Sequence, residues 1–392
     1  MENFDFDRLI ERRGTLSYKW ESCPDPDVLP MWVADMDFMT APAIIEALQK
    51  RVAHGIFGYA SVPPEFYEAV CSWHLKRHGW RIKPEEIQYT TGVVPAMSAV
   101  IKAFTKPGDK VAIHTPAYNC FFSSIRNNGC TAAETPLVQN GLRWEMNYEE
   151  IDRILADPAA KIFLLCSPQN PVGRVWTREE LVKLIELCKK HSVILCTDEI
   201  HEEFVYPGHT FIPVASLPEA DPMSTVTLTA PSKAFNTAGL QLATIICANP
   251  EMRKKIDRAV NDNECCDVSP LGVTAAMAAY EKGAPWLDAL LVYLRSNADF
   301  VEAYFSSFLP GFAVSPLEGT YLMWIDCRKK ISLTSQQIEE SLIKNEKIWI
   351  NAGTHYGAAG EGFIRLNIAC PRARLEEGLK RLEKGLKRLS NR

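Results

Sequence analysis

The feature that most constrains the fold is a pair of short apolar runs on either side of a strong helix pattern. Residues 161–166 and 192–196 are continuously apolar after their first position, and an amphipathic stretch over 177–191 lies between them. That stretch opens with Thr177 three residues before Glu180, the spacing of a helix-capping box. Strands that are apolar on both faces must be buried on both, and an intervening helix favours parallel pairing. We therefore expect an α/β protein with a mostly parallel sheet flanked by helices.

The N-terminal half extends this pattern. Apolar residues at helical spacing are followed by Gly55 and Gly79, which are typical helix-ending residues. We expect helices over 42–54, 64–78 and 96–104 and a strand over 110–114.

The pattern changes near Pro285. The remaining sequence predicts a long helix, two strands and a basic terminal helix, over 286–308, 319–325, 362–369 and 372–389. Strands gathered between helices are typical of a smaller α+β domain. We predict a large cofactor-binding domain over 42–285, and a small domain formed by 1–41 together with 286–392.

Composition excludes several classes of function. The net charge of −5 argues against nucleic acid or an anionic membrane as the main partner. No apolar run approaches the roughly 18 residues of a membrane span, and the N-terminus lacks a signal-like apolar core. The twelve cysteines are scattered without Cys-x-x-Cys pairs, so we expect reduced thiols in a cytoplasmic protein, with no disulfide framework and no metal site.

Lys233 is the first candidate for chemistry. It follows the β-like run 225–229 and is flanked by small and polar residues. Most lysines are exposed and solvated, and that is the ordinary interpretation of a single lysine. The alternative is a partly buried lysine with a neutral amine that can attack an aldehyde. Ser232 and its small neighbours leave room for a cofactor beside it.

Two further polar residues come just after the apolar runs. Asp198 follows 192–196, and Asn170 follows 161–166 in the sequence Asn-Pro-Val-Gly. Open α/β sheets bind ligands beyond the carboxyl ends of their strands. There a carboxylate can pair with a protonated pyridine nitrogen, and an amide can donate to a ring oxygen. Each residue could also serve as an ordinary capping or turn residue.

A phosphate site is predicted where Gly92, Val93 and Val94 precede a helix. Backbone N–H groups at a helix N-terminus bind anions, and glycine permits a close approach. The dinucleotide fingerprint G-x-G-x-x-G does not follow any predicted strand. A nicotinamide-dependent oxidoreductase is therefore disfavoured.

Arg365 lies in an alternating strand, on the polar face opposite Ile364 and Leu366. Its partner is either a protein carboxylate or a substrate carboxylate held by two N–H groups. Tyr118 and Tyr59 could stack on a ring or donate to a phosphate. A single tyrosine is more often packed in a core or an interface.

An amine, a carboxylate, an amide and a guanidinium are the groups needed to hold pyridoxal phosphate (PLP) and an amino acid together. With these residues in this order, nearly the whole chain resembles the fold-type I PLP enzymes of the aspartate aminotransferase superfamily. Within that superfamily it is most similar to the MalY/PatB branch of cystathionine β-lyases and cysteine-S-conjugate β-lyases. The similarity is carried by segments 30–38, 91–96, 198–201 and 232–240.

Two positions differ from the archetypal aminotransferase and support this branch. His201 replaces the tyrosine that faces the ring oxygen, and Gln241 stands where a phosphate-binding arginine is expected. The resemblance implies a homodimer in which Tyr59 reaches the phosphate of the neighbouring subunit. The cofactor site that it implies consists of Gly92, Val93, Val94, Tyr118, Asn170, Asp198, His201, Ser232, Lys233 and Tyr59.

The same resemblance implies a reaction. Lys233 would bind PLP covalently and then remove the Cα proton of the substrate, and Asp198 would keep the pyridine ring cationic. The substrate, a small sulfur-containing amino acid, would contact Ala34, Tyr118, Asn170 and Arg365, with Arg365 on the α-carboxylate. A cystathionine-like substrate would then yield a thiol, pyruvate and ammonia.

Two other functions remain open on the sequence alone. An aminotransferase on the same scaffold shares the proton transfers at Cα but returns the amino group to a keto acid. A regulatory protein that keeps PLP as a structural ligand is the alternative of another class. The complete set of Lys233, Asp198 and Arg365 disfavours it.

Overall fold

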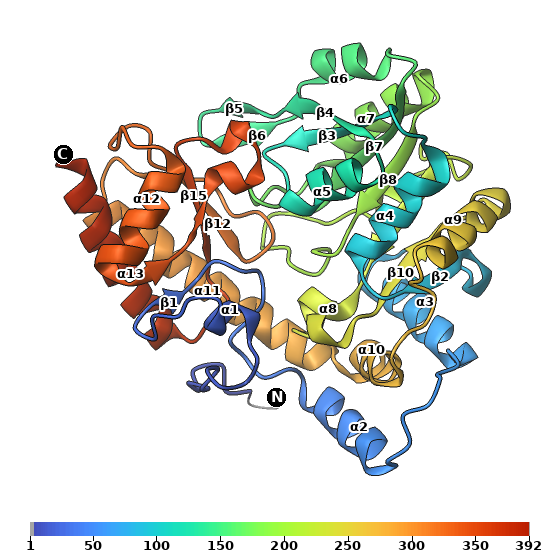
Figure 1. The fold of residues 1–392 in the computed structure, drawn as a ribbon, viewed down its shortest axis with the longest axis horizontal. Coiled ribbons are helices and arrows are strands. Elements are labelled where there is room, and N and C mark those ends of the chain that lie inside the picture. The colour runs from blue at the N-terminus through green and yellow to red at the C-terminus, as the bar shows by residue number, and fades with distance from the viewer. Residues whose placement is uncertain (1–3, 392) are drawn as a thin grey trace.

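The computed structural model describes residues 4–391. A seven-stranded sheet occupies the centre of its larger part, in the order β2-β10-β9-β8-β7-β3-β4 (Figure 1). The β10 strand runs antiparallel to both of its neighbours, and the other pairs are parallel. The strands are β2 (Ile87–Thr90), β3 (Lys110–Thr115), β4 (Thr131–Pro136), β7 (Ala160–Cys166), β8 (Ile194–Asp198), β9 (Thr225–Thr229) and β10 (Ala243–Ile246).

Helices cover both faces of this sheet, which explains why its strands are apolar throughout. In β7, Ile162 and Leu164 belong to one core cluster, whereas Phe163 and Leu165 belong to another on the opposite face. The first cluster includes residues of α4 (Val93–Phe104), α5 (Asn119–Asn127) and α9 (Pro250–Asp262). The second includes residues of α6 (Tyr148–Leu155) and α7 (Arg178–Lys190). The predicted α/β architecture is confirmed.

The capping box at the start of α7 has formed. The backbone N–H of Glu180 donates to the Thr177 hydroxyl at 3.3 Å, and the Glu180 carboxylate accepts from the backbone N–H of Thr177 at 2.8 Å. The strand after α7 lies two residues later than predicted. Ser192 has φ = 56° and belongs to the turn, so β8 begins at Ile194 and includes Asp198 at its end.

A smaller antiparallel sheet has the order β11-β12-β15-β14. Its main pair joins β12 to β15, with Trp324 opposite Arg365. The predicted strand over 319–325 begins later than expected, because Gly319 bridges to Val205 and Thr320 has φ = 68°. The elements of this part are α11 (Ala284–Phe308), β11 (Ala313–Val314), β12 (Leu322–Asp326), α12 (Ser335–Ser341), β14 (Asn351–Ala352), β15 (Phe363–Asn367) and α13 (Arg372–Ser390).

The N-terminal segment packs beside this smaller sheet (Figure 1). Strand β1 (Leu29–Pro30) pairs in parallel with β13 (Ile348–Trp349). The Asn367 side chain donates to the backbone carbonyl oxygens of Val33 and Asp35 at 2.6 and 2.7 Å. These contacts join the two ends of the chain, as the predicted small domain requires. The boundaries of the two domains stay a prediction.

The remaining elements include five further helices and a hairpin that follows β4. The helices are α1 (Tyr18–Glu21), α2 (Pro42–Ala53), α3 (Pro64–His78), α8 (Pro231–Ala234) and α10 (Pro270–Lys282), and the hairpin consists of β5 (Val138–Asn140) and β6 (Arg143–Glu145). Within residues 4–391, no helix is both long enough and apolar enough to cross a membrane.

Candidate active site

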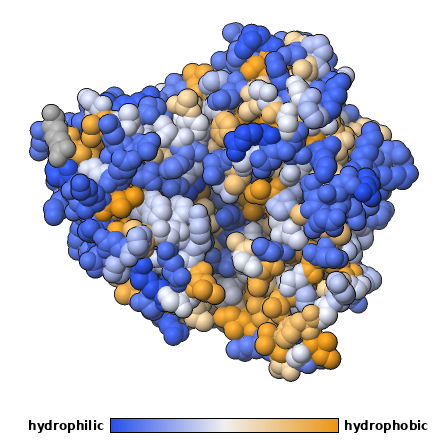
Figure 2. Space-filling view, in the orientation of Figure 1, coloured by the Kyte–Doolittle hydropathy of each residue, from blue (hydrophilic) through white to orange (hydrophobic). Residues whose placement is uncertain are grey.

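A cavity of about 660 Å³ lies where the carboxyl ends of β7, β8 and β9 approach the smaller sheet. Figure 2 shows the molecular surface hollowed near the middle of the face that it presents, between the two parts of the molecule. The cavity brings together eleven residues that the sequence singled out. They are Ala34, Gly92, Val93, Val94, Tyr118, Asn170, Asp198, His201, Ser232, Lys233 and Arg365.

Lys233 lies in α8, the single helical turn that follows β9, and its side chain reaches into this cavity. Its Nζ donates to the carbonyl oxygen of Ala34 at 2.6 Å. Burial lowers the pKa of Lys233, and the nearby carboxylate of Asp35 partly opposes that effect. A partly buried amine with a lowered pKa loses its proton more readily, and the neutral amine can act as a nucleophile and as a base.

Asp198 is the last residue of β8, between Cys166 of β7 and Leu228 of β9 in the sheet register. The side chain is buried, and one carboxylate oxygen accepts from the backbone N–H of Ile200 at 3.2 Å. Burial raises the pKa of Asp198 to about 7, although the hydrogen bond and Lys233 oppose this. The carboxylate therefore lacks a strong cationic partner, and a pyridinium N–H would supply one.

Asn170 and Arg365 connect the two sheets across the cavity. Arg365 Nη1 donates to Asn170 Oδ1 at 3.0 Å. A guanidinium can only donate, so this contact orients the amide and leaves the Asn170 NH₂ group for another acceptor.

Arg365 itself is buried but forms no ion pair with a carboxylate in the described part of the chain. Its Nη2 donates to the carbonyl oxygen of Trp32 at 2.6 Å, and its Nε has no hydrogen-bond partner among the described residues. Its guanidinium lies over the Tyr356 ring at 4.7 Å. An uncompensated buried cation favours binding of an anion such as a substrate carboxylate.

The predicted phosphate site is the N-terminus of α4. Gly92 precedes the helix, and its carbonyl oxygen accepts the first helical bond, from Ala96. The backbone N–H groups of Val93 and Val94 lie in the first turn, where they have no intrahelical partner, and Pro95 has no N–H to satisfy. Gln241, which stands where the archetype has a phosphate-binding arginine, also lines this cavity.

His201 lines the cavity as a buried residue whose Nδ1 has no partner in the described structure. Burial lowers its pKa to about 3, and Lys233 and Arg365 act in the same direction. The imidazole is therefore neutral at physiological pH and can exchange hydrogen bonds with a neighbouring group. This suits a residue that faces a cofactor ring rather than one that balances a charge.

The residues present fit PLP. The cavity has an amine for the aldehyde, a buried carboxylate in need of a cation, a free amide NH₂ and a helix N-terminus for a phosphate. The orphaned Nδ1 of His201 and Nε of Arg365 are further evidence that the site is built for polar groups that the protein itself does not supply.

The two predicted tyrosines differ in placement. Tyr118 precedes α5 and lines the cavity, where burial raises its pKa. Tyr59 is fully exposed and does not line this cavity. Apolar side chains gather over α2 and the segment after it in Figure 2, where Val52, Ile56 and Phe57 are also exposed.

Several lining residues were not found from the sequence. They come from the segment between α12 and the loop before β15 and comprise Glu339, Trp349, Asn351, His355 and Tyr356. None stands in a motif, and only the packing of the two sheets brings them to the site. Trp32 belongs to the segment 30–38, whose similarity to known enzymes was the available signal.

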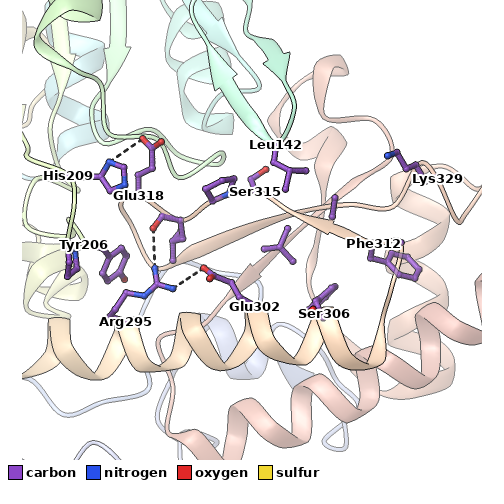
Figure 3. A pocket seen from close by; sticks show the side chains of 17 residues that line it. Leu142, Tyr206, His209, Arg295, Glu302, Ser306, Phe312, Ser315, Glu318 and Lys329 are labelled. Atoms are coloured by element: carbon purple, nitrogen blue, oxygen red, sulfur yellow. Dashed lines mark hydrogen bonds and ion pairs between the residues drawn. The ribbon is translucent and has the colours of Figure 1, made fainter.

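A second hollow, of about 680 Å³, lies beside α11 and is no candidate for the active site (Figure 3). Four of its charged or titratable side chains form two pairs. Arg295 contacts Glu302 at 2.9 Å, and His209 lies 4.0 Å from Glu318. None of its lining side chains has a buried polar atom without a partner.

Comparison with known proteins agrees with this geometry. Residues 26–382 match the family Aminotransferase class I and II. Cystathionine β-lyase PatB of Bacillus subtilis is 41% identical over 96% of this chain and 98% of its own, and protein MalY of Escherichia coli is 37% identical over 96% and 97%. The crystal structure of cystalysin from Treponema denticola, which contains PLP, superimposes with a TM-score of 0.95 at 34% identity, covering 99% of this chain and all of that one.

Proposed function

Because the chain belongs to the aminotransferase class I and II family, a family of PLP-dependent enzymes, we propose that it is a carbon–sulfur β-lyase. It cleaves L-cystathionine or a related cysteine S-conjugate. The observation that carries this proposal is the convergence of Lys233, Asp198 and Arg365 on one cavity. The names of the relatives favour elimination over amino transfer.

Different residues of the cavity would hold different parts of the cofactor. Lys233 would bind the aldehyde carbon, Asp198 would pair with the pyridine nitrogen, and Asn170 and His201 would contact the ring oxygen. The first turn of α4 and Ser232 would hold the phosphate. When bound, PLP supplies a ring that withdraws electrons from Cα of an attached amino acid.

The substrate is oriented by its carboxylate. Arg365 holds that group with donors in a fixed fork, and Ala34 and Tyr118 form neighbouring walls of the cavity. This places Cα near Lys233, whose neutral Nζ takes the Cα proton as a general base. Burial lowers the pKa of this amine, which favours its neutral form.

The overall reaction consumes one water. The bond between Cβ and sulfur breaks, and the sulfur leaves with the bonding electrons and is protonated to a thiol. The remaining three-carbon unit is hydrolysed to pyruvate and ammonia. A cystathionine substrate releases homocysteine as the thiol.

A homodimer completes the site, because Tyr59 lies outside the cavity of its own chain and is free to reach the phosphate in a second copy. Exposed apolar side chains around it support such an interface. The domains divide as 42–285 against 1–41 with 286–392. All twelve cysteines are free, which supports a reducing compartment such as the cytoplasm.

A pyruvate assay tests this function. The holoenzyme is mixed with L-cystathionine without any keto acid, and pyruvate and homocysteine are measured together. Equal amounts of both, over many turnovers, are expected. Amino transfer that requires a keto acid and exceeds pyruvate release would favour the aminotransferase, and no turnover with either would favour a PLP-binding regulatory protein.

A further inference from the structure

The N-terminal segment 33–38 is bound by a side chain that lies close to Lys233 in the sequence. Asn236 Oδ1 accepts from the backbone N–H of Met36 at 3.0 Å, and Asn236 Nδ2 donates to the carbonyl oxygens of Met36 and Phe38 at 2.9 and 3.0 Å. The Asn236 amide therefore directs both its acceptor and its donors to one stretch of backbone. We call residues 33–38 the anchored segment.

The backbone conformation at Asn236 favours an asparagine. Its φ is 55°, in the left-handed region, where asparagine occurs more often than most residues that have a side chain. Asn236 lies three residues after Lys233, and the backbone N–H of Thr237 donates to the carbonyl oxygen of Ser232 at 2.9 Å. One closed turn thus carries both the lysine and the side chain that binds the anchored segment.

The carbonyl oxygen of Ala34, within the anchored segment, faces the lysine. Lys233 Nζ donates to this oxygen at 2.6 Å and Tyr321 Oη at 3.0 Å, so both of its lone pairs are used. Asn367 donates to the carbonyl oxygens of the two flanking residues at 2.6 and 2.7 Å. The Ala34 oxygen therefore has a fixed position in the wall of the cavity.

The carboxylates near Lys233 have other partners. The carboxylate of Asp35 lies 3.1 Å from Arg12 and 3.4 Å from Lys19. Asp198 is the residue proposed to pair with the pyridine nitrogen. A neutral acceptor such as a carbonyl oxygen suits an amine that must gain and lose a proton, because a carboxylate in contact with Nζ would stabilise the charged form.

We propose that Asn236 is a positioning residue for Lys233: by binding the anchored segment, it holds the Ala34 oxygen where that oxygen receives Nζ after an amino acid has displaced the lysine from the cofactor. In that exchange the bond from Nζ to the aldehyde carbon breaks, and a bond from the amino acid nitrogen to the same carbon forms. One proton passes from that nitrogen to Nζ, which leaves as a neutral amine. The Ala34 oxygen then keeps Nζ near Cα, as a general base requires. The proposal rests on the β-lyase function proposed above.

The first test compares two ligands of the PLP-loaded enzyme. L-alanine can displace Lys233 but has no sulfur to eliminate, whereas propionate has the carboxylate alone and leaves the lysine in place. We expect Asn236→Gly to weaken binding of L-alanine about fivefold, the loss of one hydrogen bond, and to change binding of propionate less than about twofold. Calorimetry measures both affinities. Wild-type affinity for L-alanine, or an equal loss for both ligands, would overturn the proposal.

A second variant and a control complete this test. Glycine is the first choice because it accepts a positive φ without strain. Asn236→Asp keeps the size of the side chain but cannot donate to the two carbonyl oxygens, so it should also weaken L-alanine selectively. Both variants should fold, since Arg12 Nη1 still donates to the carbonyl oxygen of Met36 at 2.8 Å. Asn261→Ala, at an exposed asparagine of α9, is the control and should bind both ligands as the wild type does.

A kinetic measurement separates this proposal from the proposed function. In an active lyase, Asn236→Gly should lower kcat/KM for L-cystathionine about fivefold or more, because Nζ loses its acceptor near Cα. Wild-type kcat/KM in this variant would refute the positioning role while leaving the lyase function intact. If no substrate yields pyruvate, the lyase function fails, and a selective loss of L-alanine binding still demonstrates that Asn236 positions Lys233.

Discussion

The Nζ atom of Lys233 donates a hydrogen bond of 2.6 Å to the carbonyl oxygen of Ala34, although the two residues are 199 positions apart. Tyr321 Oη donates to the same oxygen at 3.0 Å. The Asn236 side chain, three residues after Lys233, also binds the N-terminal segment, and Asn367 binds it from the smaller sheet. The lysine is therefore positioned by a neutral carbonyl group, and burial remains the main influence on its pKa.

We predict that Lys233→Ala removes the covalent attachment of PLP and the yellow colour that comes with it. The protein should remain folded, because the lost contact is a single hydrogen bond to Ala34. Borohydride reduction followed by peptide mass mapping gives the attachment site, and Lys254→Ala, an exposed lysine on α9, is the matched control. Trapping of PLP on another lysine in the wild-type protein would refute the assignment.

We predict that Arg365→Ala impairs use of the substrate carboxylate while PLP stays bound. Arg365 is a buried cation with no carboxylate partner in the described chain, so its loss should cost roughly 2–5 kcal/mol in kcat/KM. Arg365→Lys should recover only part of this, because an ammonium lacks the planar fork. Steady-state kinetics, together with a measurement of bound PLP, tests whether Arg365 contacts the substrate. If Arg365→Ala keeps the wild-type kcat/KM, Arg365 has only a structural role.

We predict that Tyr59 acts on the cofactor of the neighbouring subunit. Tyr59→Ala and Lys233→Ala should each be poorly active as homodimers. In a mixed dimer, one site carries both lesions, and the other combines an intact Lys233 with an intact Tyr59 from the partner chain. That second site should recover activity, measured after co-expression with two affinity tags.

The control for this experiment is a mixed dimer of Lys233→Ala with Arg365→Ala. Both of these side chains line the cavity of the same chain, so each substitution affects only the site of its own subunit. Each site then lacks either Lys233 or Arg365, and no rescue is expected. If the mixed dimer of Tyr59→Ala with Lys233→Ala also shows no recovery of activity, Tyr59 does not belong to the site.

We predict a pH-dependent contribution to stability from His74, a buried residue of α3. Its Nδ1 lies 2.9 Å from the carbonyl oxygen of Val70, and its Nε2 lies 3.5 Å from Glu202. Burial lowers the pKa of His74, but the Glu202 carboxylate outweighs this and raises the pKa to about 9. The folded protein therefore holds a proton that the unfolded chain releases near pH 6.5.

The sign follows from this difference. The contribution of His74 to the free energy of unfolding is fully present below about pH 6.5, decreases as pH rises, and is lost by about pH 9, for a total of about 3 kcal/mol. Denaturant unfolding of His74→Gln should show a flatter dependence than wild type across this window. The exposed His54→Gln on the end of α2 is the control, and a wild-type slope in His74→Gln would remove His74 as the cause.

Much of the site was predictable because chemistry and local pattern coincide at strand ends. The apolar runs of β7 and β8 predicted buried parallel strands, and Asn170 and Asp198 follow from where those strands stop. The antiparallel strand β10 was not predicted, since a short buried strand has the same apolar pattern in either direction. The start of β8 was also misplaced, because a positive φ at Ser192 leaves no mark in hydrophobic periodicity.

The sequence by itself determined which residues are apolar, at what period, and in what order the reactive side chains occur. These are local properties, and they were enough for the α/β class, the strand-end site and the family resemblance. Only the tertiary structure decided that Trp32 stacks on Trp349 and that Arg365 has no carboxylate partner in the described chain. Trp32 meets Trp349 because β1 pairs with β13, and Arg365 reaches the cavity from the smaller sheet. Such contacts join residues far apart in the sequence, which no local pattern encodes.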